Sequence, residues 1–217
     1  MPLIIEGGRV PPRWTERKRC RPMGPGEGYG AGAESVRIAF LNNMPDSALE
    51  DTEIQFFELL DAASGEIPVR LKLHSLTGVP RGERGEEHLN SFYFATDGLL
   101  NSQFDAAIMT GTEPRQANLR DEPYWSTLTS VLDWAEQNTV STILSCLAAH
   151  AGVLYSDGIA RRRLSDKQFG VFEYKRVSDR ALTSGTSALV RFPHSRWNEV
   201  PEDALTSCGY TILTKQY

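Results

Sequence analysis

The sequence has little cysteine, no excess of positive charge and no long apolar run, and each shortage excludes a class of protein. Its three cysteines, Cys20, Cys146 and Cys208, show no Cys-X-X-Cys pair and no Cys/His ligand spacing, so neither a disulfide framework nor a metal site is predicted. The 23 Lys and Arg against 28 Asp and Glu give a net charge of −5, which offers no attraction for nucleic acid or an anionic membrane. Apolar runs fall short of the roughly 20 residues that a membrane span needs, so we expect a cytoplasmic protein that acts on small molecules.

The first 34 residues differ in composition from the rest of the chain. They are rich in Pro, Gly and Arg, and they lack both helical and alternating periodicity. A basic cluster at residues 17–21 is typical of a solvated tail. We therefore predict a flexible N-terminal extension over residues 1–34 and a single domain over residues 35–217, which is long enough to bury a sizeable core.

Beyond residue 34, buried-strand patterns alternate with amphipathic helix patterns. Strands are predicted over residues 35–42, 68–76, 104–111 and 139–145, and helices over residues 44–65, 85–93 and 122–138. This alternation is typical of βαβ units, so we predict an α/β fold with a mostly parallel sheet and helices on both faces. The later part of the chain instead predicts antiparallel strands and loops, over residues 169–177, 188–200 and 209–215.

Two of the predicted helices show clear signals for their start or their buried face. Ser47 and Glu50 have the spacing of a capping box at the start of the first helix. Its core-facing side chains are expected to be Leu49, Ile54, Phe57, Leu59 and Leu60. Those of the helix over residues 122–138 are expected to be Trp125, Leu128, Val131, Leu132 and Ala135.

Cys146 stands where a predicted strand gives way to small and apolar residues that predict a helix. The ends of parallel strands meet at one edge of a sheet, so the loops after Leu41 and Thr110 should lie beside it. A helix N-terminus lowers the pKa of a thiol, and its free N–H groups can hold an oxyanion, as in the nucleophile elbow. Ala148 fits that motif, whereas Leu144 stands where the best-known elbow has glycine. The spacing alone leaves a catalytic nucleophile and a buried structural cysteine both open.

Seven phrases of the sequence, in order and at matching spacing, resemble the homoserine O-acyltransferase family of methionine biosynthesis. This family includes homoserine O-succinyltransferase and its acetyl-specific relatives. The phrases are IAFLNNMP, EEHLNSFY, FDAAIMTGTEP, PYW, STILSC, KQFGVFEY and PHSR, and the resemblance extends over residues 35–217. It implies a fold like that of class I glutamine amidotransferases and a cysteine nucleophile, which falls on Cys146.

The implied reaction is a ping-pong acyl transfer with acyl-CoA and L-homoserine as substrates, and with no separate cofactor or metal. The Cys146 thiolate attacks the thioester, CoA leaves, and the γ-hydroxyl of homoserine takes the acyl group from the enzyme. By the geometry of an elbow, the backbone N–H of Leu147 faces the oxyanion. Relatives often carry a lysine directly after the Met-Pro that matches Met44 and Pro45, but Asp46 stands here. A second copy of the chain, in a homodimer, is a further candidate partner.

Three further residues align with functional positions of the family. Lys167 and Ser195 match substrate-contacting residues, and an ammonium suits the carboxylate of an amino acid or a phosphate of CoA. Outside the family context they are typical of a surface lysine and a turn serine. Arg115 falls where glycine marks succinyl enzymes and glutamate marks acetyl enzymes. A guanidinium pairs with the free carboxylate of a succinyl group, so we expect succinyl-CoA rather than acetyl-CoA as donor, and an arginine that points away from the site is the alternative.

The family takes its catalytic histidine and glutamate from a His-Pro-Glu motif beyond the PHSR segment, and this chain ends at Tyr217 before such a motif. We therefore expect the C-terminal part of the fold to be incomplete and the chain alone to turn over slowly. His150 lies four residues after Cys146 but is expected within the packed helix. His194 matches a family histidine outside the catalytic pair. The other two histidines, His74 and His88, lie in segments with no reason to reach the cysteine.

Two rival functions remain open from the sequence. A class I glutamine amidotransferase, or a related cysteine hydrolase, has the same elbow cysteine in a parallel sheet. A non-catalytic relative that keeps only the acyl-CoA pocket would show the same phrases. Glutaminase activity without homoserine-dependent CoA release would favour the first rival, and a thiol that is never acylated would favour the second.

Overall fold

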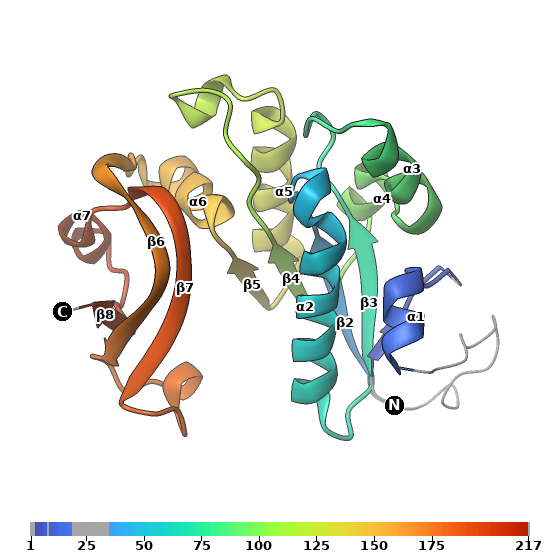
Figure 1. Ribbon diagram of the computed structural model, residues 1–217, viewed down its shortest axis with the longest axis horizontal. Helices are drawn as coiled ribbons and strands as arrows, with labels where there is room; N and C mark the ends of the chain where they lie inside the picture. Colours follow the sequence, from blue (N-terminus) through green and yellow to red (C-terminus); the bar gives the residue numbers. More distant parts are fainter. Residues whose placement is uncertain (1–2, 8, 19–34, 217) are drawn as a thin grey trace. The chain divides into compact units, whose positions relative to one another are not determined.

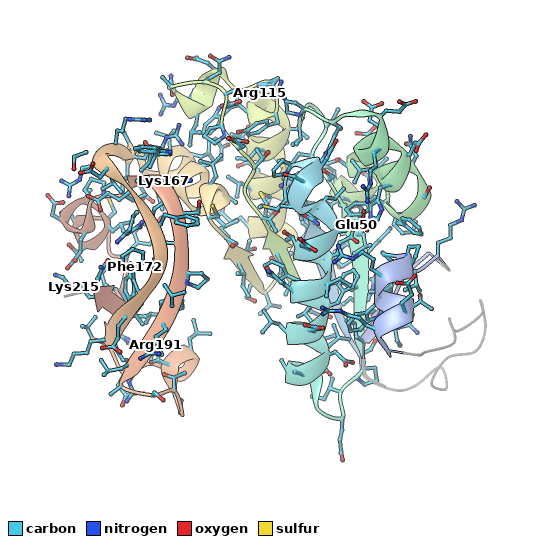
Figure 2. All side chains as sticks on the ribbon, in the orientation of Figure 1. Glu50, Arg115, Lys167, Phe172, Arg191 and Lys215 are labelled. Carbon is cyan, nitrogen blue, oxygen red and sulfur yellow. The ribbon has the colours of Figure 1, made fainter. Side chains whose placement is uncertain are left out.

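The computed structural model describes residues 3–7, 9–18 and 35–216, which belong to two compact units (Figure 1). Residues 1–149 belong to the first unit and residues 150–217 to the second, so the division falls within the helix α6 (Leu147–Asp157). Figure 2 adds the side chains to the same ribbon. Each unit has a sheet of its own, and the two sheets differ in the direction of their strands.

The first unit is built on a five-stranded sheet in which every neighbouring pair of strands is parallel. The strand order is β1-β3-β2-β4-β5, with the bounds Leu3–Ile5 (β1), Val36–Leu41 (β2), Val69–His74 (β3), Ala106–Met109 (β4) and Ser141–Leu144 (β5). In the central strand β2, the consecutive residues Ala39, Phe40 and Leu41 are fully buried, so both faces of the sheet are covered. The predicted α/β fold with a mostly parallel sheet is thereby confirmed.

The helices of the first unit follow its strands along the chain. Their bounds are Pro12–Lys18 (α1), Asp46–Ser64 (α2), Glu83–Phe92 (α3), Thr96–Leu100 (α4) and Trp125–Asn138 (α5), with a 3-10 turn over Leu119–Asp121 (η1). On α5 the residue Trp134 is buried, whereas Trp125 and Leu132, which were expected in the core, are only partly buried. Within the described ranges no helix is both long and apolar enough to cross a membrane.

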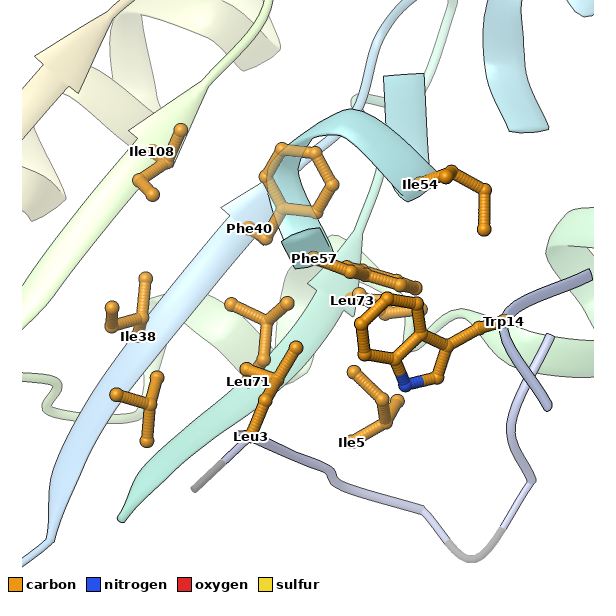
Figure 3. Close-up of a cluster of buried hydrophobic side chains, with 11 residues drawn as sticks. Leu3, Ile5, Trp14, Ile38, Phe40, Ile54, Phe57, Leu71, Leu73 and Ile108 are labelled. Atoms are coloured by element: carbon orange, nitrogen blue, oxygen red, sulfur yellow. The ribbon is translucent and has the colours of Figure 1, made fainter. Parts of the chain in front are cut away.

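The core of the first unit lies between the central strands and α2 (Figure 3). Phe40 of β2, Leu73 of β3 and Phe57 of α2 are all fully buried. The Phe40 and Phe57 rings meet edge to face, with 6.3 Å between their centroids. Burying each of these side chains contributes about 1.5–3 kcal/mol, so this layer stabilises the parallel sheet.

The N-terminal segment corrects the sequence analysis. β1 joins the parallel sheet beside β3. Trp14 of α1 is buried, and its ring packs edge-on against Phe57 with 5.5 Å between the centroids. The prediction of a flexible extension is therefore wrong for the described residues of this segment, because a three-residue strand and a seven-residue helix are too short to show a periodicity. Residues 19–34, which include Cys20, lie outside the described residues.

The start and one face of α2 also differ from prediction. Asp46 is already helical and Pro45 is the N-cap, so Ser47 lies inside the first turn and the predicted capping box is wrong. No side chain caps this end of the helix. Leu59, expected in the core, is 65% exposed, whereas the polar Glu53 is buried.

The second unit is a three-stranded antiparallel sheet, which confirms the prediction for this part of the chain. The strand order is β7-β6-β8, with the bounds Arg162–Arg176 (β6), Leu189–Glu199 (β7) and Thr214–Gln216 (β8). A 3-10 turn, Ala181–Thr183 (η2), lies between β6 and β7, and the helix Glu202–Ser207 (α7) precedes β8. β6 and β7 form a long hairpin, labelled at Phe172 and Arg191 in Figure 2, with a register shift between Arg163 and Gln168.

Candidate active site

The carboxyl ends of β2, β4 and β5 meet at one edge of the parallel sheet, as the sequence predicted. The Thr110 N–H donates to the Leu41 carbonyl at 2.9 Å, and the Ser145 N–H donates to the Met109 carbonyl at 2.9 Å. Asn43 connects the loop after β2 to the loop after β4. Its backbone N–H donates to the Thr110 hydroxyl at 2.8 Å, and its side-chain amide donates to the Thr110 carbonyl at 3.0 Å. These loops therefore form one hydrogen-bonded surface beside the turn that follows β5.

Cys146 occupies that turn with a φ angle of 57°, the one positive φ among the described non-glycine residues. A left-handed backbone costs an L-residue on the order of 1–2 kcal/mol, and such strain is concentrated at functional sites. The cysteine side chain is exposed. The alternative of a buried structural cysteine is therefore wrong, and the backbone has the conformation of a nucleophile elbow.

Gly111 allows the loop after β4 to come close to the same turn. A β-carbon at this position would lie 2.5 Å from the backbone nitrogen of Leu147 and 2.6 Å from its β-carbon, so no larger residue fits unless the backbone moves. Leu147 is the first residue of α6, and N–H groups in a first helical turn have no acceptor within the helix. Its N–H is thus held at a strained turn beside a glycine, as an oxyanion donor requires. Gly111 was predicted only as the last residue of the strand over residues 104–111, and its contact with Leu147 was not anticipated.

Asp46, where relatives often carry a lysine, anchors the start of α3. Its Oδ2 accepts the N–H of Gly82 at 2.7 Å, and its Oδ1 lies 3.4 Å from the guanidinium of Arg81. The Arg81 side chain is 4% exposed and also donates to the carbonyls of Met44 and Asn42. Burial lowers the pKa of Arg81, and the adjacent Asp46 opposes this shift. A carboxylate in this position supplies no positive charge to an oxyanion, so residue 46 does not replace the lysine of those relatives.

A buried polar cluster supports the loop after β2. Glu53 of α2 accepts a hydrogen bond from the Tyr93 hydroxyl at 2.6 Å and lies 2.7 Å from Nε2 of His88. Asn42 donates to the Tyr93 hydroxyl at 3.2 Å and to the Leu49 carbonyl at 3.0 Å. Burial and the adjacent Glu53 raise the pKa of Tyr93 well above its ordinary value. Sequence reasoning missed this cluster, although a glutamate among the core-facing residues of α2 is a signal for it.

Arg115 lies in the loop between β4 and η1, and Figure 2 shows it beyond the carboxyl end of the parallel sheet. Its backbone N–H donates to Oε1 of Glu122 at 2.6 Å, and the N–H of Gln116 donates to the same oxygen at 2.7 Å. The side chain is exposed, and it has no ion-pair partner among the described residues. The charge of Arg115 is therefore available to a ligand. Glu122 was not anticipated from the sequence.

Lys167 and Ser195 lie together on the second unit. Ser195 of β7 pairs with Phe169 of β6, and the Lys167 ammonium lies 5.2 Å from the centroid of the Phe169 ring. All three residues are exposed, so they share one solvent-facing side of the β6–β7 hairpin. The structure thus brings the two residues predicted to contact substrate onto one surface.

The histidines differ in their surroundings. Burial lowers the pKa of His74 and of His150 to about 4, and burial also lowers that of His194. His88 lies on α3, the helix that follows β3, and it pairs with Glu53. β2 and β4 lie between β3 and β5 in the sheet. At about 4.8 Å between neighbouring strands, β3 is roughly 14 Å from β5, the strand that leads to Cys146. Among the described residues, no group of three or more His, Cys, Asp or Glu side chains could hold a metal ion.

Comparison with known proteins places these observations in a family. The family model described as homoserine O-succinyltransferase matches residues 14–217. The chain belongs to the homoserine O-succinyltransferase family. A homoserine O-succinyltransferase of Rhodopseudomonas palustris is 47% identical over 184 residues, which are 85% of this chain and 55% of that relative. Those of Methylorubrum extorquens and Bradyrhizobium japonicum are 46% and 41% identical, and they match 83% and 99% of this chain and 53% and 65% of their own lengths.

Two further facts qualify this member of the homoserine O-succinyltransferase family. The chain spans about half the length of most of the curated relatives it matches. A crystal structure of a protein described as a candidate GMP synthase subunit, from Thermoplasma acidophilum, matches with a TM-score of 0.51 and 13% identity, over 84% of this chain and 74% of that chain. Such a subunit is a glutamine amidotransferase, so the likeness confirms the class I glutamine amidotransferase-like fold, and at this identity it shows the fold alone.

Asp46 and Arg115 are the two positions at which the sequence led us to expect a departure from the homoserine O-succinyltransferase family pattern. Each departure has a partner that was not evident from the sequence. Asp46 is paired with the buried Arg81, and the backbone of Arg115 is bound by the buried Glu122.

Proposed function

We propose that this chain transfers a succinyl group from succinyl-CoA to the γ-hydroxyl of L-homoserine, a step of methionine biosynthesis, through a thioester on Cys146. The observation that supports this most strongly is the exposed cysteine at a positive-φ turn before α6, in a chain of this family. The curated relatives are named for this activity, and the chain matches about half of their length.

The reaction consists of two half-reactions with Cys146 as the nucleophile. In the first, the thiolate bonds to the thioester carbonyl carbon, the bond from that carbon to the CoA sulfur breaks, and the CoA thiolate takes up a proton. In the second, the hydroxyl oxygen of homoserine bonds to the acyl carbon, the bond to Cys146 breaks, and the hydroxyl proton passes to a base. The N–H of Leu147 donates to the oxyanion of both tetrahedral intermediates. The dipole of α6, an 11-residue helix, favours the thiolate.

Three residues are proposed to bind the substrates. Lys167 and Ser195, on one side of the hairpin, offer an ammonium and a hydroxyl to the carboxylate of homoserine or to a phosphate of CoA. Arg115 offers its exposed guanidinium, which has no ion-pair partner among the described residues, to the free carboxylate of the succinyl group. An acetyl group has no such carboxylate, which is why succinyl-CoA is the proposed donor.

Neither histidine of the first unit, His74 or His88, is assigned as the general base of the second half-reaction. His74 is fully buried with a pKa of about 4, and His88 is bound to Glu53 beyond two intervening strands.

Intact-protein mass spectrometry tests the proposal. After incubation with succinyl-CoA, the wild-type chain should gain the mass of one succinyl group, and Cys146→Ala should gain none. Cys208→Ala is the matched control, because Cys208 is also an exposed free thiol, and it should be acylated like the wild type. Added L-homoserine should remove the acyl group, and O-succinylhomoserine should be detected. An unmodified wild type, or a Cys146→Ala variant that is still acylated, would refute the assignment.

A cysteine hydrolase acting on glutamine is the second candidate, because an exposed cysteine at a positive-φ turn after a parallel strand is also the nucleophile arrangement that such an enzyme needs. In that case the Cys146 thiolate attacks the side-chain amide of glutamine, and ammonia leaves. Release of ammonia from glutamine, together with no acylation by succinyl-CoA, would favour this candidate over the first.

A further inference from the structure

A buried carboxylate fixes the loop that presents Arg115. Oε1 of Glu122 accepts the N–H groups of Arg115 and Gln116 at 2.6 and 2.7 Å. Glu122 is only 3% exposed, and its Oε2 is buried with no hydrogen-bond partner among the described residues. The two loop amides are therefore the contacts that offset the cost of burying this side chain, and the loop conformation is coupled to the acceptor oxygen of Glu122.

The backbone that carries the Glu122 carboxylate is itself held by close contacts. Gly78 has a φ of +90°, and a β-carbon there would lie 2.9 Å from the carbonyl oxygen of Pro123, so the turn at residue 78 packs directly against the backbone after Glu122. The Glu122 carbonyl accepts the N–H of Trp125 at 3.0 Å, where α5 begins. Tyr124, between these two contacts, is 2% exposed. The backbone at and after Glu122 is thus held in place, and the Glu122 side chain fixes the Arg115 loop to it.

The same loop leaves Gly111, the residue that packs against the Leu147 backbone beside Cys146. Four residues along the chain from Gly111 stands the exposed Arg115, so the loop begins at the cysteine turn and is fixed again at Arg115. A loop fixed at both points holds its backbone still and leaves only the side chain of Arg115 to move. This arrangement reduces the entropy lost when the guanidinium binds an anion.

We propose that Glu122 is a positioning residue for acyl selection: by binding the Arg115 and Gln116 amides, it presents the Arg115 guanidinium to an acyl-CoA whose acyl chain ends in a carboxylate. This inference rests on the proposed function and names the residue through which Arg115 acts. Glu122 itself touches neither the substrate nor Cys146.

The first test measures donor selectivity, which is the rate of Cys146 acylation by succinyl-CoA divided by the rate with acetyl-CoA. Arg115→Ala should lower this ratio about tenfold, which corresponds to the loss of one charge-assisted contact. Glu122→Ala should lower the ratio to a similar extent, whereas Glu122→Gln keeps an acceptor oxygen and should retain most of it. Asp121→Asn, an exposed acid one residue away, is the matched control and should keep the wild-type ratio.

The double variant separates action through Arg115 from a general effect. Because Glu122 is proposed to act only through Arg115, Glu122→Ala in the Arg115→Ala background should leave the ratio of the single Arg115→Ala variant unchanged. A ratio that falls further in the double variant would overturn the inference. So would a Glu122→Ala variant with the wild-type ratio.

Hydrogen exchange supplies a readout that does not depend on activity. The amides of Arg115 and Gln116 should exchange at least tenfold faster in Glu122→Ala than in the wild type or in Asp121→Asn, with melting temperatures recorded for each. Unchanged exchange would overturn the positioning role. If neither donor acylates the wild type, the proposed function fails and the selectivity role falls with it, whereas a measurable ratio that is indifferent to Glu122 refutes this inference alone.

Discussion

At position 111, the space available to one methyl group decides what the chain tolerates. Gly111→Ala would place a β-carbon 2.5 Å from the Leu147 nitrogen, and because the contact is with backbone, a side-chain rotation cannot relieve it. We expect Gly111→Ala to move the Cys146 turn and to slow acylation by succinyl-CoA at least tenfold, with a loss of about 1–3 kcal/mol in the free energy of unfolding. Acylation followed by mass spectrometry and denaturant unfolding measure the two effects.

Gly98→Ala is the control for that experiment. Gly98 lies in α4, where a β-carbon would have no atom within 4 Å, and alanine favours a helix over glycine. The control should keep the wild-type acylation rate and gain slightly in stability. Equal acylation rates for the two alanine variants would show that the contact between Gly111 and Leu147 has no role at the site.

At the scale of elements, the N-terminal helix α1 is part of the folded unit. Trp14 is 6% exposed and packs on Phe57, so Trp14→Ala should lower the free energy of unfolding by about 3–5 kcal/mol. Arg13→Ala removes a half-exposed ion pair with Asp51 from the same helix and should cost less than about 1 kcal/mol. Guanidinium chloride titrations compare the two. A loss at Trp14 no larger than that at Arg13 would show that this helix adds nothing to the fold.

The sequence predicted elements where a pattern is long enough to repeat, and it failed where partners are distant. The strands over β2 to β5 and the turn at Cys146 were found because apolar runs and the residues that end them are local signals. β1 and Trp14 were missed because three or seven residues give no period. Glu53 and Tyr93 are 40 residues apart, so their contact exists only once the sheet has formed. Glu122 binds backbone only six and seven residues before it, but the loop between them is irregular and gives no periodic signal. The cysteine turn was therefore easier to predict than the contacts that support it.

At the scale of the whole molecule, buried histidines make stability depend on pH. His74 has a pKa of about 4 in the folded chain against an ordinary 6.5, so between these values the unfolded chain binds a proton that the folded chain does not. The contribution of His74 to the free energy of unfolding is therefore fully present above pH 6.5. It is lost as the pH drops toward 4, by up to roughly 3 kcal/mol. His150, which is partly buried and also has a pKa of about 4, acts in the same direction in the second unit.

Denaturant unfolding at pH 7 and pH 5 measures this dependence. Nδ1 of His74 lies 3.2 Å from the Phe94 carbonyl, and His74→Gln keeps an N–H that can donate to it while removing the titrating group. The variant should lose less stability than the wild type between the two pH values. The same loss in both proteins would place the pH dependence elsewhere.

The backbone conformation at Cys146, which exposes its thiol, also lowers the stability of the fold. Glycine takes a φ of 57° without the steric cost that cysteine bears there, so the fold would be more stable with no side chain at this position. The role proposed for the Cys146 sulfur accounts for a residue other than glycine at this position. The chain is thus less stable than its backbone would permit, and the difference is the strain required to expose one thiol.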